Sequence, residues 1–256
     1  MAGRALRRLA GRPLRVIPAS FGWRSGTLSG ARRLTPSARS LTFRVPGWPG
    51  NEAGQHVDVR LTAPDGYRAV RSYSMASVGD GDEVELAVAR LPDGEVSPFL
   101  VDELELGDRV ELRGPLGGFF VWRSGQAQCT QLIAGGSGVV PLVAMVRAHA
   151  AADDRAPMQL LYSLRTPADA FYADELGGFT ATVPTTWHYT RTPPPGGDRP
   201  AGRLTEHDLR EQTLPVENEP LIYVCGPTGF VEAVSRQLVS LGHAAASVRT
   251  ERFGGV

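Results

Sequence analysis

The hydrophobic pattern of this 256-residue chain changes near residue 122. Before that position, short runs such as HVDVRL (56–61) and EVELAVA (83–89) alternate apolar and polar residues and are separated by turns rich in Pro and Gly. Alternation with a period of two predicts half-buried antiparallel strands. After that position, apolar runs such as MQLLYSL (158–164) alternate with helix-like stretches, which predicts a parallel sheet covered by helices. The chain is therefore expected to fold into two domains of different class.

The first domain is expected over residues 25–123 as an antiparallel six-stranded β-barrel. A short helix is predicted after Ser97, because serine at the N-cap and proline at the next position are typical of a helix start. The second domain is expected over residues 128–256 as a parallel-sheet α/β unit, and residues 1–24 as a basic, flexible leader. The predicted strands of the first domain are 27–34, 38–45, 55–62, 68–77, 83–90 and 108–113. The second domain is predicted to contain, in order, strand 131–134, helix 139–153, strand 158–164, helix 168–176, strand 180–190, helix 205–212, strand 220–225, helix 228–241 and strand 245–251.

Composition excludes several classes of protein. The 27 basic residues balance the 27 acidic ones, which argues against a general nucleic-acid binder. The only two cysteines, Cys129 and Cys225, cannot supply a disulfide framework or a four-cysteine metal site, and they suit a reducing cytoplasm. No apolar run approaches the roughly 18 residues of a membrane span. We therefore expect a soluble cytoplasmic protein without a metal site and without a membrane anchor.

The stretch RSYSMAS (71–77) combines a cation, an aromatic ring and hydroxyls on an extended segment. In a strand, Arg71, Tyr73, Met75 and Ser77 share one face. A guanidinium grips phosphate and a flat ring stacks on a planar group, so this face suits a planar cofactor that carries phosphate. Further along, the backbone from Gly94 onward leads into the predicted helix start, where free N–H groups favour a phosphate.

Two stretches of the second half carry similar signals. In IAGGSGVVPLVAM (133–145) a strand meets a glycine turn and a helix, although the spacing is neither that of the Rossmann fingerprint nor that of a P-loop. Glycines permit close backbone approach and the helix start favours anions, yet an ordinary βα turn fits the pattern as well. In YVCGPTG (223–229), Cys225 ends an apolar strand at the edge where open α/β sheets bind ligands. A small buried hydrophobic residue is the alternative role for this cysteine.

These blocks, together with GPLGGFF (114–120) and the ending ERFG (251–254), resemble in sequence and order those of the ferredoxin–NADP reductase superfamily. The resemblance covers about residues 25–255. It implies an FAD-binding barrel, a NAD(P)H-binding domain, hydride transfer from nicotinamide to flavin, and one-electron delivery to a ferredoxin-like or other redox protein. FAD rather than FMN follows from the resemblance alone. The chain lacks the four cysteines of a plant-type [2Fe–2S] domain, so the acceptor would be a separate molecule.

The resemblance also implies roles for individual residues. Catalysis would involve Ser74 beside the flavin, and Cys225 and Glu251 at the flavin–nicotinamide contact. Flavin binding would involve Arg71, Tyr73, Ser74, Val88, Arg90, Gly94, Val96 and Ser97. Nucleotide binding would involve Gly135, Gly136, Ser137, Gly138, Cys225, Gly226 and Pro227, with Phe253 near the contact of the two rings.

The choice of nicotinamide depends on the ends of two predicted strands, at Arg165 and at Thr190–Arg191. Neither end carries an acidic residue that would bind a ribose 2′-hydroxyl, and two arginines with neighbouring hydroxyls suit a 2′-phosphate. We therefore favour NADPH, although similar arginines occur in NADH-dependent relatives. Two other functions stay open: a non-catalytic flavin electron-transfer subunit of a larger complex, and a flavin-binding regulatory module. A monomer is expected.

Overall fold

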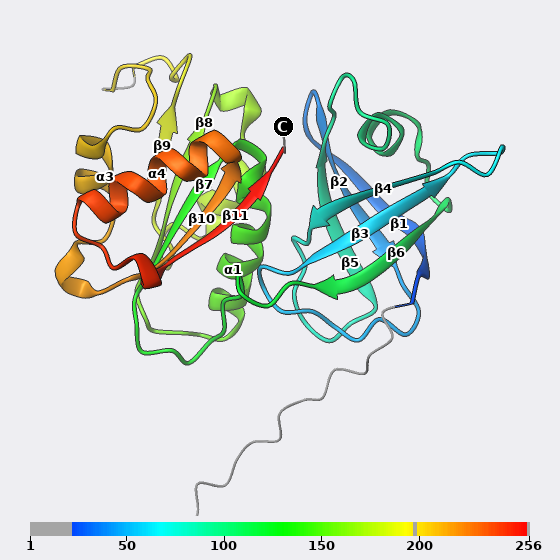
Figure 1. Ribbon diagram of the computed structural model, residues 1–256, viewed down its shortest axis with the longest axis horizontal. Helices are drawn as coiled ribbons and strands as arrows, with labels where there is room; N and C mark the ends of the chain where they lie inside the picture. Colours follow the sequence, from blue (N-terminus) through cyan, green and yellow to red (C-terminus); the bar gives the residue numbers. More distant parts are fainter. Residues whose placement is uncertain (1–21, 197–198, 255–256) are drawn as a thin grey trace, which may run out of the picture.

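The computed structural model describes residues 22–196 and 199–254, so most of the predicted leader lies outside the described residues. Two units lie side by side, an all-β unit and an α/β unit, with helix α1 (Val139–Ala151) between them (Figure 1). This architecture confirms the predicted fold class. The positions at which the two predicted domains begin and end stay a prediction.

The all-β unit is an antiparallel barrel in which the strands follow the order β4-β3-β6-β1-β2-β5. An isolated bridge between Met75 and Leu86 brings the end of β4 to β5. The alternating pattern turns side chains such as Phe43, Val59 and Leu112 into a core where they are fully buried. The six strands are β1 (Arg24–Thr35), β2 (Ala38–Arg44), β3 (His56–Thr62), β4 (Arg68–Ser74), β5 (Glu83–Ala89) and β6 (Arg109–Leu116).

The helix expected after Ser97 is a single π-helical turn, η1 (Phe99–Glu103). The Ser97 hydroxyl does not cap it, because it accepts a hydrogen bond from the backbone N–H of Leu91 at 3.0 Å. That bond closes the 91–97 loop instead. The C-terminal carbonyls of the turn are satisfied by Arg39 on β2, whose guanidinium donates to Leu100, Val101 and Leu104.

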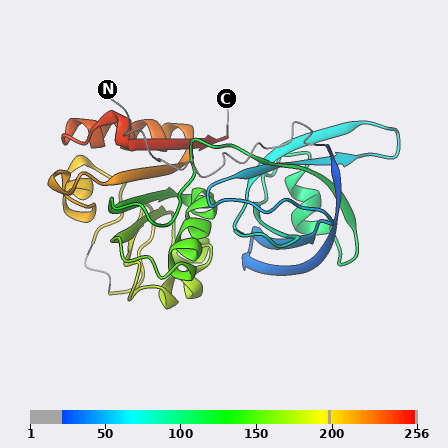
Figure 2. The same ribbon diagram turned by 90° about the horizontal axis from the view of Figure 1, so that it is seen from below.

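The α/β unit is a parallel sheet in the order β11-β10-β7-β8-β9. Figure 2 shows α1 on one side of this sheet and α4 on the other. Successive residues of the central strands serve the two faces in turn: Leu132 packs toward α1, and Ile133 packs toward α3 and α4. Besides α1, the elements are β7 (Thr130–Gly135), β8 (Met158–Leu164), α2 (Ala173–Gly178), β9 (Thr185–Tyr189), α3 (Glu206–Gln212), β10 (Leu221–Pro227), α4 (Thr228–Ser240) and β11 (Val248–Phe253).

Three predicted elements of this unit are shorter or shifted. The predicted helix 168–176 is a 3₁₀ turn over Pro167–Asp169 followed by α2, because Tyr172 adopts a left-handed conformation (φ 57°) that interrupts a helix. The predicted strand 180–190 pairs only over β9, since a turn occupies the residues before Pro184. The predicted last strand 245–251 begins at Val248, after a 3₁₀ turn over Ala245–Ser247, and continues to Phe253.

Candidate functional site

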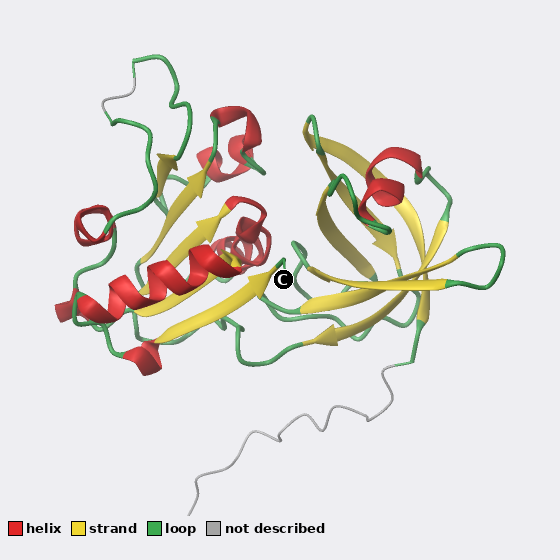
Figure 3. Cartoon of the chain, turned by 45° about the horizontal axis from the view of Figure 1, so that its top comes forward, coloured by secondary structure: helices red, strands yellow, loops and turns green. Residues whose placement is uncertain are grey.

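A cavity of about 420 Å³ lies between the two units, at the carboxyl ends of the parallel strands. The chain's C-terminal strand β11 ends at the same junction (Figure 3). The cavity brings together eight of the residues singled out in the sequence. They are Arg90 from the barrel and Gly135, Gly136, Ser137, Arg165, Thr190, Pro227 and Phe253 from the α/β unit.

On the barrel side, Tyr73 lies half-buried near the end of β4, opposite Val57 on β3. Burial raises the pKa of its hydroxyl to about 12, so the side chain is a neutral phenol at physiological pH. Arg71, on the same face of the strand, forms an ion pair with Glu95 (Nη2–Oε2 2.8 Å) in the loop before η1. An aromatic ring and a guanidinium that are two residues apart on one strand fit the ring and the phosphates of a flavin nucleotide.

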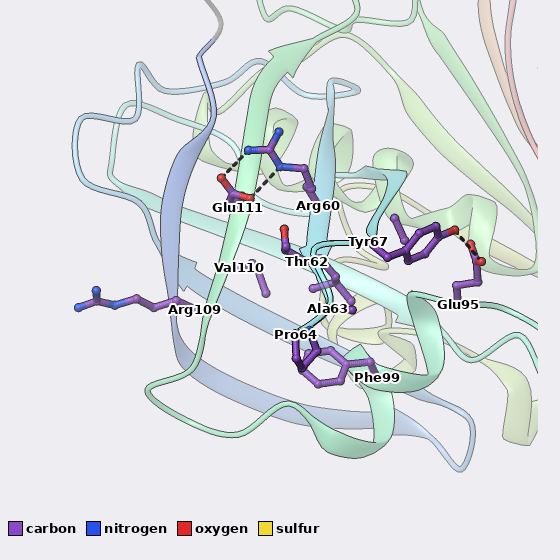
Figure 4. A pocket seen from close by; sticks show the side chains of 12 residues that line it. Arg60, Thr62, Ala63, Pro64, Tyr67, Glu95, Phe99, Arg109, Val110 and Glu111 are labelled. Atoms are coloured by element: carbon purple, nitrogen blue, oxygen red, sulfur yellow. Dashed lines mark hydrogen bonds and ion pairs between the residues drawn. The ribbon is translucent and has the colours of Figure 1, made fainter.

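Beyond the Arg71–Glu95 pair, a second cavity of about 520 Å³ opens on the barrel (Figure 4). Tyr67 and Phe99 present aromatic rings to it, and the Tyr67 hydroxyl bonds to Glu95 at 3.0 Å. Sequence reasoning missed these residues. The sequence did carry a signal for Tyr67. It directly precedes β4, four residues before Arg71 and six before Tyr73, so a continued strand would turn all three side chains to one face. Apolar walls and a few polar groups are typical of a small-molecule site.

Of the remaining flavin residues predicted from the sequence, two lie in the barrel core and two make contacts in the segment that follows β5. Val88 and Val96 are fully buried in the barrel core, so only their backbone can face a ligand. Arg90 forms an ion pair with Asp102 at 2.6 Å, and its backbone N–H bonds to the carbonyl of Ser37. Gly94 closes a turn through its N–H and the carbonyl of Leu91.

The three predicted catalytic residues come together across the interface. The Ser74 hydroxyl at the end of β4 donates to Glu251 Oε1 on β11 at 3.2 Å. Cys225 on β10 is the register partner of Glu251 in the sheet. Burial raises the pKa of Glu251 to about 7, against the opposing effect of the Ser74 hydrogen bond. The fold therefore places an acid that titrates near neutrality at the junction of the two units.

Cys225 is fully buried. Burial, and next the charge of Glu251, raise the pKa of its thiol well above the usual value. A protonated, enclosed thiol is a poor nucleophile. This environment does not fit covalent catalysis, and Cys225 is not among the residues that line the cavity between the units.

The glycine turn after β7 packs tightly against the protein itself. A Cβ at Gly138 would lie 2.3 Å from the carbonyl oxygen of Cys225, and one at Gly135 would lie 2.6 Å from the Phe230 ring. The close approach that the sequence predicted is therefore an approach of the β7–α1 turn to β10 and α4. Gly136 has a φ of 55°, which suits glycine, and faces open space.

The strand ends that were expected to select the nicotinamide lie side by side. The N–H of Arg191 bonds to the carbonyl of Arg165 at 3.0 Å, and the N–H of Thr190 bonds to that of Leu164 at 2.8 Å. Both arginines are exposed, and Arg165 lines the cavity between the units. Asp169 lines it too, with its carboxylate held by Thr166. Sequence reasoning missed Asp169 because it follows the strand end by several residues.

Comparison with known proteins identifies both units. Residues 25–121 match the family model described as oxidoreductase FAD-binding domain, and residues 132–236 match the oxidoreductase NAD-binding domain. The chain belongs to the FAD- and NAD-binding oxidoreductases of the ferredoxin reductase type. The resemblance inferred from the sequence is confirmed, as are FAD and a nicotinamide nucleotide as the ligands.

Among curated relatives, the chain is 35% identical over 245 residues to a flavohemoprotein of Pseudomonas putida, which covers 92% of this chain and 61% of that protein. It is 32% identical over 231 residues to the toluate 1,2-dioxygenase electron transfer component of Pseudomonas putida (88% and 66%). The FAD/NAD-binding domain of nitric oxide dioxygenase from Vibrio cholerae superimposes with a TM-score of 0.80 at 26% identity, over 91% of this chain and 99% of that one. The chain spans less than two thirds of the length of these two curated relatives.

Two further observations concern the described residues alone. Across 22–196 and 199–254, no group of three or more His, Cys, Asp or Glu side chains is arranged to hold a metal ion. In the same part of the chain, every helix is too short or too polar to cross a membrane.

Proposed function

We propose that the chain is an FAD-dependent NAD(P)H oxidoreductase that passes electrons to a separate redox protein. The observation that carries this proposal is the Ser74–Glu251 hydrogen bond, because it joins the end of the flavin strand to the C-terminal strand of the nucleotide unit. Tyr73 and Arg71 would hold FAD, which would supply the hydride-accepting and electron-transfer chemistry. The protein supplies position, polarity and exclusion of water.

On the flavin side, Tyr73 offers an aromatic face and Arg71 a guanidinium for the diphosphate. The cavity beside Tyr67 and Phe99 continues from Arg71 along β4 in the direction away from Tyr73. At about 3.3 Å per residue, the six residues from Tyr73 to Tyr67 span roughly 20 Å. A ring at each end with phosphate-binding groups between them suits a dinucleotide, and we propose this cavity for the adenosine half of FAD.

At the junction, Ser74 and Glu251 would hold a proton close to the reacting rings, and Cys225 would shape the floor of the nicotinamide pocket. The turn Gly135–Gly138 would receive the pyrophosphate of the nucleotide at the start of α1. Because the pKa of Glu251 is about 7, its carboxyl group can exchange a proton at physiological pH.

For the nucleotide, Arg165 and Arg191 with Thr190 support NADPH, since two guanidinium groups suit a 2′-phosphate. The carboxylate of Asp169 in the same cavity favours NADH, because it repels a phosphate and accepts from a hydroxyl. We propose NADPH as the preferred donor. A preference for NADH that Arg191→Ala leaves unchanged would refute this choice.

Relatives of the chain include a toluate 1,2-dioxygenase electron transfer component and a ferredoxin–NAD(P)(+) reductase component of Ralstonia. A ferredoxin-like protein or an oxygenase component is therefore the proposed acceptor, with this chain acting as a monomer in the cytoplasm. A flavin electron-transfer subunit that a partner reduces is the second candidate.

Anaerobic mixing of the FAD-loaded protein with NADPH or NADH distinguishes these functions. We expect bleaching of the flavin absorbance within seconds, and Ser74→Ala and Cys225→Ala should slow it by about 10–100-fold while FAD stays bound. The comparison of kcat/KM for the two nucleotides tests the choice of donor. If neither nucleotide bleaches the flavin, the chain is no NAD(P)H reductase. If both variants react at the wild-type rate, the roles of Ser74 and Cys225 are wrong.

A further inference from the structure

Arg147, near the end of α1, connects the two units through its side chain, which is only 21% exposed. Its Nη1 donates to Glu85 on β5 of the barrel (2.6 Å) and to the carbonyl oxygen of Ala76 (2.9 Å). Its Nε and Nη2 donate to the two carboxylate oxygens of Glu175 on α2, at 2.6 and 2.9 Å. One guanidinium, carried by α1, therefore links the barrel to α2.

The barrel partner Glu85 is itself held by further hydrogen bonds. Glu85 also accepts from the hydroxyls of Ser40 (2.6 Å) and Tyr172 (2.9 Å). Burial alone would raise the pKa of Glu85, but the hydrogen bonds and charge of Arg147 hold it below its usual value. The Arg147 guanidinium lies over the Tyr172 ring, with its central carbon 5.1 Å from the ring centroid. The backbone of Tyr172 has a φ of 57°, which is uncommon for a bulky residue. Such a conformation persists where the surroundings fix it.

Both ends of this connection lie next to the proposed site. Ala76 follows Ser74 by two residues on the segment that carries Tyr73. Helix α1 begins directly after Gly138. The distance between the flavin strand and the nucleotide turn is therefore spanned by one side chain and one short helix.

Most of the remaining contact between the units on this side is apolar. Ala53, Ala76 and Ala87 of the barrel belong to one buried cluster with the residues of α1. Apolar contact holds surfaces together without a preferred direction. Arg147, in contrast, makes charge-assisted hydrogen bonds to two oxygens of the barrel, on Glu85 and Ala76, and to the two carboxylate oxygens of Glu175 on α2. Such hydrogen bonds have a preferred direction.

We propose that Arg147 is a positioning residue, which sets the angle between the two units through Glu85 and Ala76 and thereby the approach of the nicotinamide to the flavin. This rests on the proposed hydride transfer. Reacting atoms must come within about 3–3.5 Å, and a displacement of about 1 Å can cost about 10²-fold in rate. A side chain that touches neither ring can therefore control the rate.

The first test compares stability with rate. Arg147→Met should leave FAD bound and slow flavin reduction by at least about tenfold. In the double variant Arg147→Met/Glu85→Gln, no charged carboxylate is left at position 85 without its guanidinium, and the amide oxygen at that position still accepts from Ser40 and Tyr172. We expect its melting temperature to recover and its rate to stay low. The control is Arg123→Met/Glu52→Gln, which removes an exposed Arg–Glu pair and should react at the wild-type rate.

The second test measures the geometry directly. Both native cysteines are buried, so spin labels attach selectively to Leu106→Cys on the barrel and Val239→Cys on α4, two exposed positions. The distance distribution between the labels should broaden when Arg147→Met is added. If Arg147→Met does not fold, the double variant and Glu85→Gln, which retains the acceptor for Ser40 and Tyr172, take its place.

Two results would overturn the proposal. One is a double variant that recovers the rate together with stability, and the other is an unchanged distance distribution in the variants. Failure of the hydride-transfer function gives a different result, because the wild type itself would then not react with either nucleotide, while the label distances would still respond to Arg147.

Discussion

At the residue scale, the chemistry of the site depends on groups whose protonation burial changes. Glu251 has a pKa of about 7, and the thiol of Cys225 stays protonated. Both lie at the carboxyl edge of the parallel sheet, on neighbouring strands. A carboxylate on a surface loop would have a pKa near 4.5 and could not exchange a proton at physiological pH.

The raised pKa of Glu251 predicts a pH dependence of stability. Between pH 4.5 and 7 the folded cofactor-free protein binds a proton that the unfolded chain has lost, so the free energy of unfolding should fall as the pH rises through this range. The decrease should amount to about 1–3 kcal/mol. Urea unfolding at pH 5 and pH 8 measures it. Glu251→Gln should reduce the difference, and a variant with the full wild-type decrease would show that another group is responsible.

At the element scale, the turn between β7 and α1 shows how strand packing and ligand binding share one segment. Its backbone approaches β10 so closely that the carbonyl of Cys225 occupies the place of a side chain at position 138. That approach fixes the turn before α1 beside the cavity between the two units. A glycine turn of this kind is thus required by the fold before any ligand binds.

Gly138→Ala should therefore impair folding and nucleotide binding together. The new methyl group would meet a backbone oxygen at 2.3 Å, which no rotamer change relieves, so we expect a loss of about 1–3 kcal/mol in the free energy of unfolding and weaker NAD(P)H binding. The matched control is Gly177→Ala in α2, where nothing lies within 4 Å and a gain of up to about 1 kcal/mol is expected. Equal stabilities of the two variants would contradict the packing argument.

At the scale of the whole molecule, two units of different class share one buried cluster, to which the barrel contributes Ala53, Phe120 and Trp122. The interface is also the site, since Ser74 and Glu251 meet across it. FAD bound to the barrel should therefore stabilise both units and not the barrel alone.

Removal of FAD should lower the melting temperature of the protein. A ligand that binds only the folded state adds about 2.7 kcal/mol at a hundredfold excess over its Kd. For a protein of this size this corresponds to roughly 5–10 °C. Thermal melts with and without added FAD measure the shift. Tyr73→Ala should lose about tenfold in FAD affinity and show a smaller shift at equal FAD concentration; an unchanged shift would show that the ring does not contact the flavin.

The sequence by itself determined the class of each unit, most of their elements and the order of the ligand-binding blocks. These features depend on local signals: a period of two, apolar runs, and glycine or proline at turns. The same signals failed where a single residue overrode the pattern. Examples are Tyr172, whose left-handed conformation interrupts the helix expected there, and Ser97, whose hydroxyl closes a loop instead of capping a helix.

Only the tertiary structure decided which side chains meet. Ser74 and Glu251 are separated by 177 residues, Arg147 and Glu85 by 62, and Arg71 and Glu95 by 24. No local pattern encodes such pairs, because they depend on how the barrel and the parallel sheet pack against each other. The pKa of Glu251 has the same origin, since burial is a property of the assembled interface and not of the residue.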